Sequence, residues 1–323
     1  GHEGLCAAFK DFKFLDNDQQ IADYTKNDLV ETDKVVIKKV WMDTKRKNKK
    51  DEIMASAAGV MDKIKEFKPD LVFLGDDNAT NYVGAQLIDT KTPVVFWGVD
   101  LTPMKYGYID SMDHPGHNIT GVYQSGYYKD CMVNLKKLYP NIKTYAILSD
   151  DSETGRAKAV AVTKDVAEGG LGLELVDTVT TNSFSEWKTK ALELQDKVDA
   201  FFIPTHASLK NEEGKPVDMM EAGAWYIKNI KKPEAVPEKH MVREGMLLTA
   251  DDSGYKQGYE AVRMADMILH GKKNPADIAV VAPSRGAIIV NKKRAQILGL
   301  DLTDKTFIEE YVENSLALDK YPQ

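Results

Sequence analysis

The sequence predicts an α/β protein of two lobes, each with a parallel sheet covered by helices. Its 323 residues are more than a single hydrophobic core usually organises. Along most of the chain, short apolar runs of strand length alternate with helical patterns, which is typical of a parallel sheet. The alternation begins again near residues 119–124, so we expect two Rossmann-like halves of similar pattern.

The stretch 68–80, KPDLVFLGDDNAT, is the clearest strand–loop–helix unit of the first lobe. Residues 70–74 form an apolar run of strand length, GDDN breaks it, and helical spacing follows from Ala79. Ligands of open α/β sheets lie outside the carboxyl ends of the strands. We therefore expect this loop to contact a small ligand.

The rest of the first lobe continues the same alternation. The expected elements, in chain order, are a helical region at 4–30 with a break near 14–17, a strand at 34–42, an amphipathic helix at 51–67, a strand at 70–74, a helix at 79–88 and a strand at 93–99. Because the chain opens on a helical pattern, we expect the first strand of this lobe, with its ligand loop, to be missing from the sequence.

The second lobe repeats the pattern after residue 119. We expect strands at 119–123, 144–148, 173–179, 199–203 and 246–250, helices at 127–138, 154–168, 185–194, 217–228, 255–269 and 292–298, and a closing pair of strands at 279–281 and 287–290. Segments 120–123, 248–250 and one within 281–288 are the expected crossovers of a multi-strand hinge. The expected lobes are 1–120 with about 250–282, and 121–249 with about 283–323.

The composition excludes several classes of function. A net charge of −7 argues against nucleic acid or anionic lipid as the main partner. No apolar run reaches the length of a membrane span. No CxxC, HExxH or histidine cluster is present, so we expect no metal and no cofactor. The basic run at 45–50 is interpreted as a solvated loop, with a docking role as the alternative.

Acidic residues mark the ends of several predicted strands. Pairs of aspartates occur at 76–77, 150–151 and 251–252, and Asp100 follows another strand. Such residues either cap the next helix or bind a ligand's ammonium or hydroxyl groups. Residues 78–80 and 152–154 lie at predicted helix starts. Their hydroxyl and amide groups either cap these helices or hold a ligand carboxylate. A zwitterionic amino acid would match an aspartate in one lobe and a helix start in the other.

Two aromatic residues and one histidine complete the candidates. Trp97 and Tyr123 lie next to predicted strand ends, where an aromatic ring either packs the lobe or stacks on a ligand. His206 follows a strand and is either a hydrogen-bonded structural residue or a ligand contact. The full set of candidate ligand-binding residues is Asp77, Asn78, Ala79, Thr80, Trp97, Asp100, Tyr123, Gln124, Asp151, Ser152, Glu153, Thr154, Thr205, His206 and Asp251.

Several segments together resemble a known family. They include DLVFLGDDNAT, HNITGVYQSG with its NxTGV turn, YAILSDDSETGR, VDAFFIPTHASL and GMLLTADDSGYKQGYEAVRMADMILHGKKNPADI. In order and spacing, from about Val35 to Leu300, they are similar to the ABC-transporter substrate-binding proteins of the tryptophan/tyrosine-binding kind. One departure concerns specificity, because THAS at 205–208 stands where many relatives carry Asp-Asn.

The resemblance implies a fold, a partner and a location. The fold is the type I periplasmic binding protein, which closes two lobes about a hinge on a ligand in the interlobe cleft. The ligand is an amino acid or an aromatic amino-acid-like compound, and the partner is an ABC transporter permease. The protein is expected to be a monomer in the periplasm or outside the cell, free or lipid-anchored, with its signal peptide absent from this sequence.

Two other functions are alternatives to solute capture. The segment MDTKR at 42–46 is similar to family members associated with sensory kinases, so a ligand-sensing domain feeding a membrane-bound kinase or cyclase is the runner-up. An α/β enzyme using an aspartate as base is the third. It is disfavoured because no nucleophile with a base, no GxSxG motif and no phosphate loop is present. We therefore expect no catalytic residue.

Overall fold

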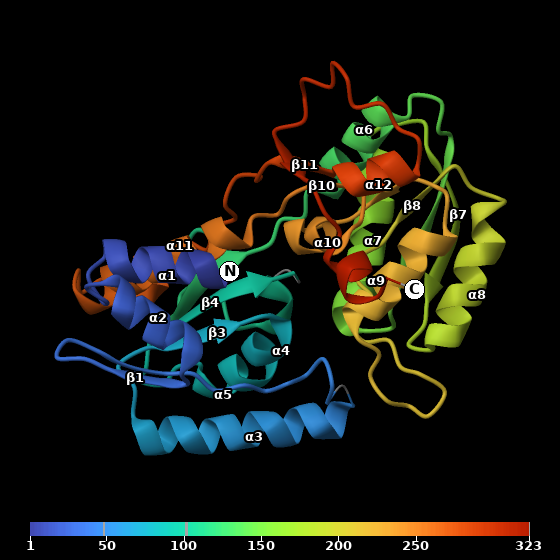
Figure 1. The fold of residues 1–323 in the computed structure, drawn as a ribbon. Coiled ribbons are helices and arrows are strands. Elements are labelled where there is room, and N and C mark those ends of the chain that lie inside the picture. Colours follow the sequence, from blue (N-terminus) through green and yellow to red (C-terminus); the bar gives the residue numbers. More distant parts are fainter. Residues whose placement is uncertain (48, 101–102, 323) are drawn as a thin grey trace. The chain divides into compact units, whose positions relative to one another are not determined.

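The computed structural model describes residues 1–47, 49–100 and 103–322 of the chain, which divides into two compact units (Figure 1). Unit 1 consists of residues 1–125 and 253–284, and unit 2 of residues 126–252 and 285–323. The chain therefore passes from one unit to the other three times, after residues 125, 252 and 284.

Unit 1 contains a parallel sheet of three strands, in the order β3 (Val72–Gly75), β4 (Val94–Val99) and β5 (Ile119–Tyr123). Val94 lies opposite Val72 on one side and Ile119 on the other. Val94, Val95 and Phe96 are fully buried, because both faces of β4 are covered. The carboxyl ends of all three strands meet at one edge, as the sequence predicts.

Helices cover both faces of this sheet. One helix, α11 (Gly254–Leu269), contacts β4 and β5 and in turn packs against α1 (His2–Asp11). The other face is covered by α3 (Lys50–Phe67) together with a short helical run after β3. The remaining helical segments of unit 1 are α2 (Asp18–Lys26), α4 (Asp77–Ala79), a π-helical turn (Thr80–Gly84), α5 (Ala85–Leu87) and two 3-10 turns (Pro103–Tyr106 and Pro275–Asp277).

A hairpin replaces the strand expected at 34–42. Only β2 (Val36–Lys38) is extended there, and it pairs antiparallel with β1 (Leu29–Glu31), where a helix was expected. The prediction of a parallel strand was therefore wrong. A turn causes the reversal: the Thr32 amide donates to the Val35 carbonyl at 2.9 Å, and the Thr32 hydroxyl accepts from the Val35 amide at 3.0 Å. The predicted helix break near 14–17 is confirmed, since α1 ends at Asp11 and α2 begins at Asp18.

Unit 2 contains a larger mixed sheet of seven strands. The sheet order is β12 (Glu310–Val312), β11 (Ile288–Asn291), β10 (Leu248–Ala250), β9 (Glu234–Ala235), β8 (Ala200–Phe202), β6 (Thr144–Ser149) and β7 (Glu174–Thr180). Every neighbouring pair is parallel except β10 and β11. The core of this unit is therefore a doubly wound α/β sheet with two added antiparallel strands.

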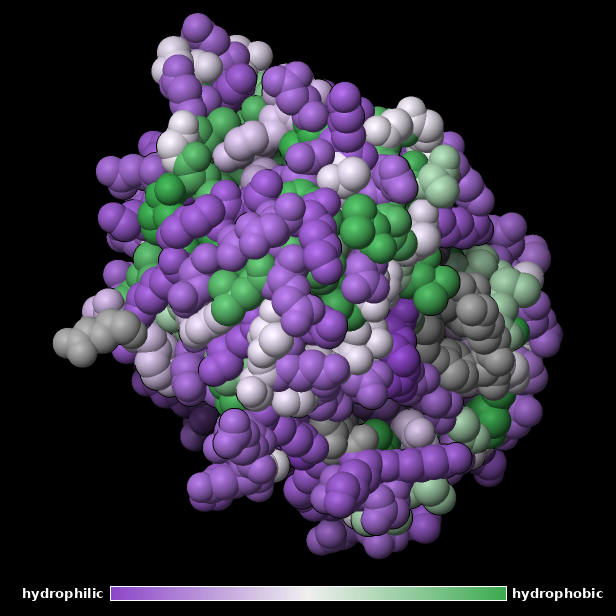
Figure 2. Space-filling view, turned by 90° about the vertical axis from the view of Figure 1, so that its right-hand side faces the viewer, coloured by the Kyte–Doolittle hydropathy of each residue, from purple (hydrophilic) through white to green (hydrophobic). Residues whose placement is uncertain are grey.

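Helices cover both faces of the unit 2 sheet. They are α6 (Tyr128–Leu138), α7 (Glu153–Glu168), α8 (Phe184–Gln195), α9 (Met219–Asn229), α10 (Lys239–Glu244), α12 (Lys292–Ile297) and α13 (Leu316–Lys320). One hydrophobic cluster joins α6, α7 and α12 to one face of the sheet, and a second joins α8, α9 and α10 to the other. The face shown in Figure 2 is mostly hydrophilic, with hydrophobic residues in small groups between hydrophilic ones.

The closing strands do not pair with each other as expected. In the structure β11 pairs with β10 in unit 2, whereas Val281 makes an isolated parallel bridge with Val122 in unit 1. The prediction was wrong because the chain leaves unit 1 between the two segments, after residue 284. Two of the expected crossovers are regular sheet strands, and the chain changes unit just after them: after β5 it leaves unit 1, and after β10 it leaves unit 2.

Candidate ligand-binding site

Asp76 and Asp77 organise the carboxyl edge of the unit 1 sheet. Asp76 follows β3 with a φ of 76°, which is uncommon for a residue with a side chain, and its amide donates to the Trp97 carbonyl at 3.0 Å. Its carboxylate accepts from the Asp77 amide at 2.8 Å. The Asp77 carboxylate is buried and accepts from the Asp100 amide at 3.4 Å. A buried carboxylate therefore joins the loops that follow β3 and β4.

The next three residues serve the start of the helix and the loop beside it. Asn78 donates its side-chain amide to the Thr44 hydroxyl at 3.0 Å. Ala79 packs against the hydrophobic core of the unit. Thr80 is fully buried and donates its hydroxyl to the Asp76 carbonyl at 2.9 Å. The Thr80 hydroxyl is thus used in a hydrogen bond within the loop itself.

Amide groups from three elements converge on Gly98, near the end of β4. Gly98 has a φ of 68°, and a Cβ there would lie within 4 Å of the Asp76 amide nitrogen, Gln124 Nε2 and Gln257 Oε1. Gln257 is fully buried in the first turn of α11. Sequence reasoning included Gln124 but missed Gln257, because its helix follows much later in the chain. The serine cap at 253 marks that helix start and was an available signal.

Trp97 and Tyr123 both contribute to the packing of unit 1. Trp97 is partly buried against the clusters formed by α1 and α11, and a Cβ at Gly75 would lie 3.1 Å from its ring. Tyr123 packs against the cluster beneath α3, and its amide donates to the Val281 carbonyl at 3.0 Å. The packing interpretation therefore applies to both rings, and their role in ligand stacking stays a prediction.

In unit 2, Asp150 plays the part that Asp77 plays in unit 1. It is fully buried at the end of β6, and one oxygen accepts from the Ser152 amide at 3.1 Å and the Ser152 hydroxyl at 2.6 Å. The other oxygen accepts from the Thr205 hydroxyl at 3.2 Å and the Ser208 amide at 2.9 Å. This carboxylate joins the loops after β6 and β8. Sequence reasoning chose its neighbour Asp151 instead.

The start of α7 follows the capping interpretation. The Ser152 hydroxyl donates to Asp150 and also accepts from the Gly155 amide at 3.0 Å. It therefore caps α7 and holds Asp150 at the same time. Asp151 is exposed and forms an ion pair with Arg156 at 2.5 Å. Glu153 is exposed and Thr154 is partly exposed in the first turn. Their contact with a ligand stays a prediction.

His206 lies in the core of unit 2. Its ring is fully buried beside Trp187, and its Nε2 is 2.7 Å from Glu244 Oε1. Burial alone would lower the pKa of His206, but the carboxylates of Glu244 and Asp150 outweigh it and raise that pKa. This environment favours the structural interpretation of His206.

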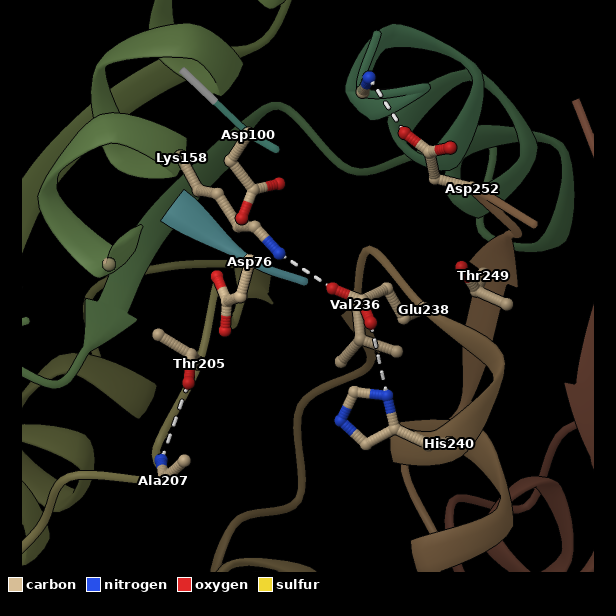
Figure 3. A network of polar contacts seen from close by, with 12 residues as sticks. Asp76, Asp100, Lys158, Thr205, Ala207, Val236, Glu238, His240, Thr249 and Asp252 are labelled. Carbon is tan, nitrogen blue, oxygen red and sulfur yellow. Dashed lines mark hydrogen bonds and ion pairs between the residues drawn. The ribbon is translucent and has the colours of Figure 1, made fainter. Parts of the chain in front are cut away.

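Lys158, Glu238 and His240 form a linked group of charged side chains in unit 2 (Figure 3). Lys158 of α7 is almost fully buried and pairs with Glu238 at 2.6 Å, and His240 Nδ1 is 3.2 Å from the same carboxylate. Burial alone would raise the pKa of Glu238, but Lys158 and His240 hold it well below its usual range. Asp251 accepts from the Lys239 amide at 2.8 Å, and burial raises the pKa of Asp251.

Sequence reasoning missed the pair of Lys158 and Glu238. Lys158 has the same helical spacing as the buried residues Gly155, Ala159 and Val162, so a cation on the apolar face of α7 was the available signal. Among the described residues, no group of three His, Cys, Asp or Glu side chains is arranged to hold a metal ion. None of the described helices combines the length and apolarity needed to cross a membrane.

Comparison with known proteins identifies the class. The two α/β units with parallel sheets form a periplasmic-binding-protein-like fold. A complex with L-Trp from Streptococcus pneumonia superposes with a TM-score of 0.69 at 21% identity, covering 97% of this chain and 96% of that one. A ligand-free, open substrate-binding protein with adhesive properties from Clostridium difficile gives a TM-score of 0.62 at 23% identity, covering 81% and 84%. At these identities the likeness shows the fold.

Residues 16–310 match the family model described as ABC transporter substrate binding protein, and the chain belongs to this family. It is also 24% identical over 250 residues to a tyrosine-binding protein of Clostridioides difficile (strain R20291), covering 76% of this chain and 68% of the relative. The protein is therefore the substrate-binding component of an ABC transporter and not an enzyme. Members of this family act outside the cytoplasm.

Proposed function

We propose that the protein captures a free amino acid with an aromatic side chain and delivers it to an ABC transporter permease. Two relatives support this choice: the one from Clostridioides difficile is described as tyrosine-binding, and the one from Streptococcus pneumonia holds L-Trp. Capture between the two lobes by hinge closure, as the family resemblance implies, is part of the proposal.

The observation that carries the proposal is the polar edge of the unit 1 sheet. Carboxylates and side-chain amides follow the carboxyl ends of the strands there, with Asp77, Asp100 and Gln124 coming from three successive loops and Gln257 from α11. Aspartate oxygens suit a ligand ammonium group, to which they make charge-assisted hydrogen bonds. The same negative charge disfavours phosphate or sulfate ligands.

Unit 2 supplies further candidates for the polar groups of the ligand. Thr205, which follows β8, and Thr154, in the first turn of α7, remain partly exposed. In this proposal these groups face the ligand carboxylate, whereas Ser152 and His206 serve the fold. The ligand roles of Asp151, Glu153 and Asp251 stay predictions that variants can test.

Thermal denaturation with a ligand panel tests the proposal. The panel contains L-Trp, L-Tyr and L-Phe, with indole, D-Trp, arabinose and L-Glu as comparisons. A ligand that binds only the folded state raises the melting temperature by mass action, by several degrees at saturating concentration. We expect the L-aromatic amino acids to raise it and the comparison compounds to have little effect. Stabilisation by arabinose alone, or by none of the panel, would contradict the proposal.

A matched pair of variants tests the aspartate choice. Asp100→Asn removes a negative charge from the polar edge of unit 1, and loss of one charge-assisted hydrogen bond weakens ligand binding about tenfold or more. Asp62→Asn removes an exposed charge on α3 that is already paired with Lys65, so we expect less than about a twofold change. Equal effects of the two changes on the dissociation constant would show that Asp100 has no special role.

A further inference from the structure

The segment 38–50 of unit 1 has a charge opposite to that of the whole chain. It contains seven Lys or Arg residues and one Asp, whereas the chain has a net charge of −7. The basic residues are Lys38, Lys39, Lys45, Arg46, Lys47, Lys49 and Lys50. Asn48 lies outside the described residues. We call 38–50 the basic segment.

The basic segment is fixed along the length of α3 (Figure 1). At one end, Lys38 Nζ lies 5.5 Å from the centre of the Phe67 ring, in the last turn of α3. At the other end, the Lys49 amide donates to Glu52 in the first turn at 3.1 Å. Between them, Met42 packs into the core cluster beneath α3. The described residues of the segment are therefore in contact with α3 or its core at Lys38, Met42 and Lys49.

Exposure alternates along residues 41–45 of the segment. Met42 is partly buried in the core, and Thr44 accepts the hydrogen bond from Asn78, so these two face inward. Their neighbours Trp41, Asp43 and Lys45 are exposed. Asp43 has a φ of 53°, and the chain turns after it, where the Arg46 and Lys47 amides donate to the Asp43 carbonyl at 3.1 and 2.9 Å. Trp41 and the cations of the turn, Lys45, Arg46 and Lys47, are therefore exposed within one short segment.

Most of these cations lack a compensating charge. Lys45, Lys47, Lys49 and Lys50 are exposed, and in the part of the chain that the structure describes no carboxylate lies within ion-pair distance of them. Arg46 is 3.5 Å from Asp43 but remains 74% exposed. The positive charge is thus available to a partner.

Trp41 is exposed and yet held in one orientation. Its side chain is 71% exposed, while its indole N–H donates to Asp28 at 2.9 Å and Lys39 Nζ lies 5.9 Å from its ring. An exposed tryptophan loses the gain of burying a large apolar ring. Met54, on the outward face of α3, is 53% exposed as well. An oriented tryptophan beside lysines is the side-chain combination found at membrane–water interfaces.

We propose that the basic segment docks unit 1 on an anionic lipid surface, with Trp41 inserted among the headgroups. Clusters of four to eight Lys or Arg bind anionic bilayers electrostatically, and an inserted aromatic ring adds apolar burial. The negative charge of the rest of the chain is repelled by the same bilayer, so the protein would bind in one orientation. The whole-chain charge therefore argues only against binding through its other surfaces.

Vesicle sedimentation tests this surface. The purified protein is mixed with vesicles of phosphatidylcholine alone, or with about one third phosphatidylglycerol, over a range of salt concentrations. We expect binding to the anionic vesicles only, weakening as salt screens the charges. Each cation near such a surface contributes about 1 kcal/mol, which corresponds to about fivefold in the partition coefficient.

Two variants and a control separate this surface from general effects. Lys45→Glu/Lys47→Glu/Lys49→Glu should weaken partitioning at least about 100-fold. Lys164→Glu/Lys197→Glu/Lys293→Glu makes the same change of charge on exposed lysines of unit 2 and should leave most of the binding intact. Trp41→Phe should abolish the vesicle-induced blue shift of the protein fluorescence. Circular dichroism and melting temperature confirm that each variant folds.

Three results would overturn the proposal: equal binding to neutral vesicles, equal loss with the unit 2 control, or no binding to anionic vesicles at low salt. Tight binding of the basic segment to polyglutamate, without binding to vesicles, would instead assign the surface to an acidic protein. None of these outcomes depends on the amino-acid ligand, because the vesicle experiment is run without it. Failure here would leave the proposed function unaffected.

Discussion

Buried aspartates at strand ends are the residues that shape both polar edges. Asp77 links the loops after β3 and β4, and Asp150 links the loops after β6 and β8. In each case the carboxylate of a residue just after a strand accepts from the backbone of a neighbouring loop. The sequence showed aspartates at these positions but not which member of a pair would turn inward. At 150–151 the buried member is the first one, which sequence reasoning passed over.

Replacing Asp150 should be more harmful than replacing Asp151. Asp150→Asn turns a buried acceptor of four hydrogen bonds into a group with one acceptor oxygen, which costs about 1–3 kcal/mol of unfolding free energy. Asp151→Asn breaks only an exposed ion pair and costs about 0.5 kcal/mol or less. Urea unfolding followed by far-ultraviolet circular dichroism measures both. The reverse order would contradict the structural role given to Asp150.

The buried pair of His206 and Glu244 should make stability depend on pH. Because the pKa of His206 is raised in the folded state, its contribution is fully present below the unfolded pKa of about 6.5 and is lost as pH rises through the folded value. We therefore expect the free energy of unfolding to fall as the pH rises above about 6.5.

Two variants separate this pair from other titrating groups. Glu244→Gln removes the carboxylate that raises the pKa of His206, so it should flatten the dependence on pH whatever its effect on overall stability. His206→Gln removes the imidazole itself and should flatten the dependence on pH in the same way. A wild-type stability that rises between pH 6 and pH 8 would be the wrong sign for this account.

At the scale of elements, close approach of backbone segments decides what the sequence tolerates. Gly121 in the NxTGV turn lies on β5, and a Cβ there would meet the Phe96 carbonyl oxygen at 2.3 Å. The neighbouring Thr120 hydroxyl is buried and donates to the Ile278 carbonyl at 2.6 Å. The motif that carried much of the family resemblance therefore works by fitting β5 tightly between β4 and the returning chain.

Two glycine-to-alanine changes in unit 1 should have opposite effects. Gly121→Ala forces strands apart and should cost about 1–3 kcal/mol. Gly59→Ala adds a methyl group in open space on the exposed face of α3, where alanine favours the helix by about 0.5–1 kcal/mol. Chemical denaturation of both variants tests the pair. Destabilisation by Gly59→Ala would contradict the finding that Gly59 lies on a solvent-exposed face of α3.

Periodicity predicted most elements because it reports burial directly. The helices α6, α7, α8, α9 and α12 and the strands β4, β6 and β8 appear where the patterns place them, whereas α10 and α13 were not predicted. Two errors concern strand pairing, which tertiary contacts decide: β2 pairs with β1, and β11 pairs with β10. A third is β9, which has only two residues and is too short to produce a pattern. Similarly, the polar edges were predictable as strand ends, whereas Gln257 comes from a helix far along the chain and Lys158 pairs with Glu238, 80 residues away.

At the scale of the whole molecule, charge is distributed unevenly in a way that an average hides. The net charge of −7 coexists with a basic segment on unit 1, and acidic residues follow the strands in both units. The net charge of the whole chain argues against nucleic acid and anionic lipid as partners, but this argument does not apply to the surface formed by the basic segment. Family membership was predictable because motifs in a fixed order extend along nearly the whole chain, and the match over residues 16–310 confirms it.

Isothermal titration calorimetry tests the central claim, amino-acid capture, most directly. The protein is first unfolded, dialysed and refolded so that any bound small molecule is removed, and it is then titrated with L-Trp, L-Tyr and L-Phe. We predict saturable binding of at least one of them at one ligand per chain, with a dissociation constant of about 1 µM or tighter. No saturable heat with any of the three up to about 1 mM, together with tight binding of a sugar or a nucleoside, would contradict it.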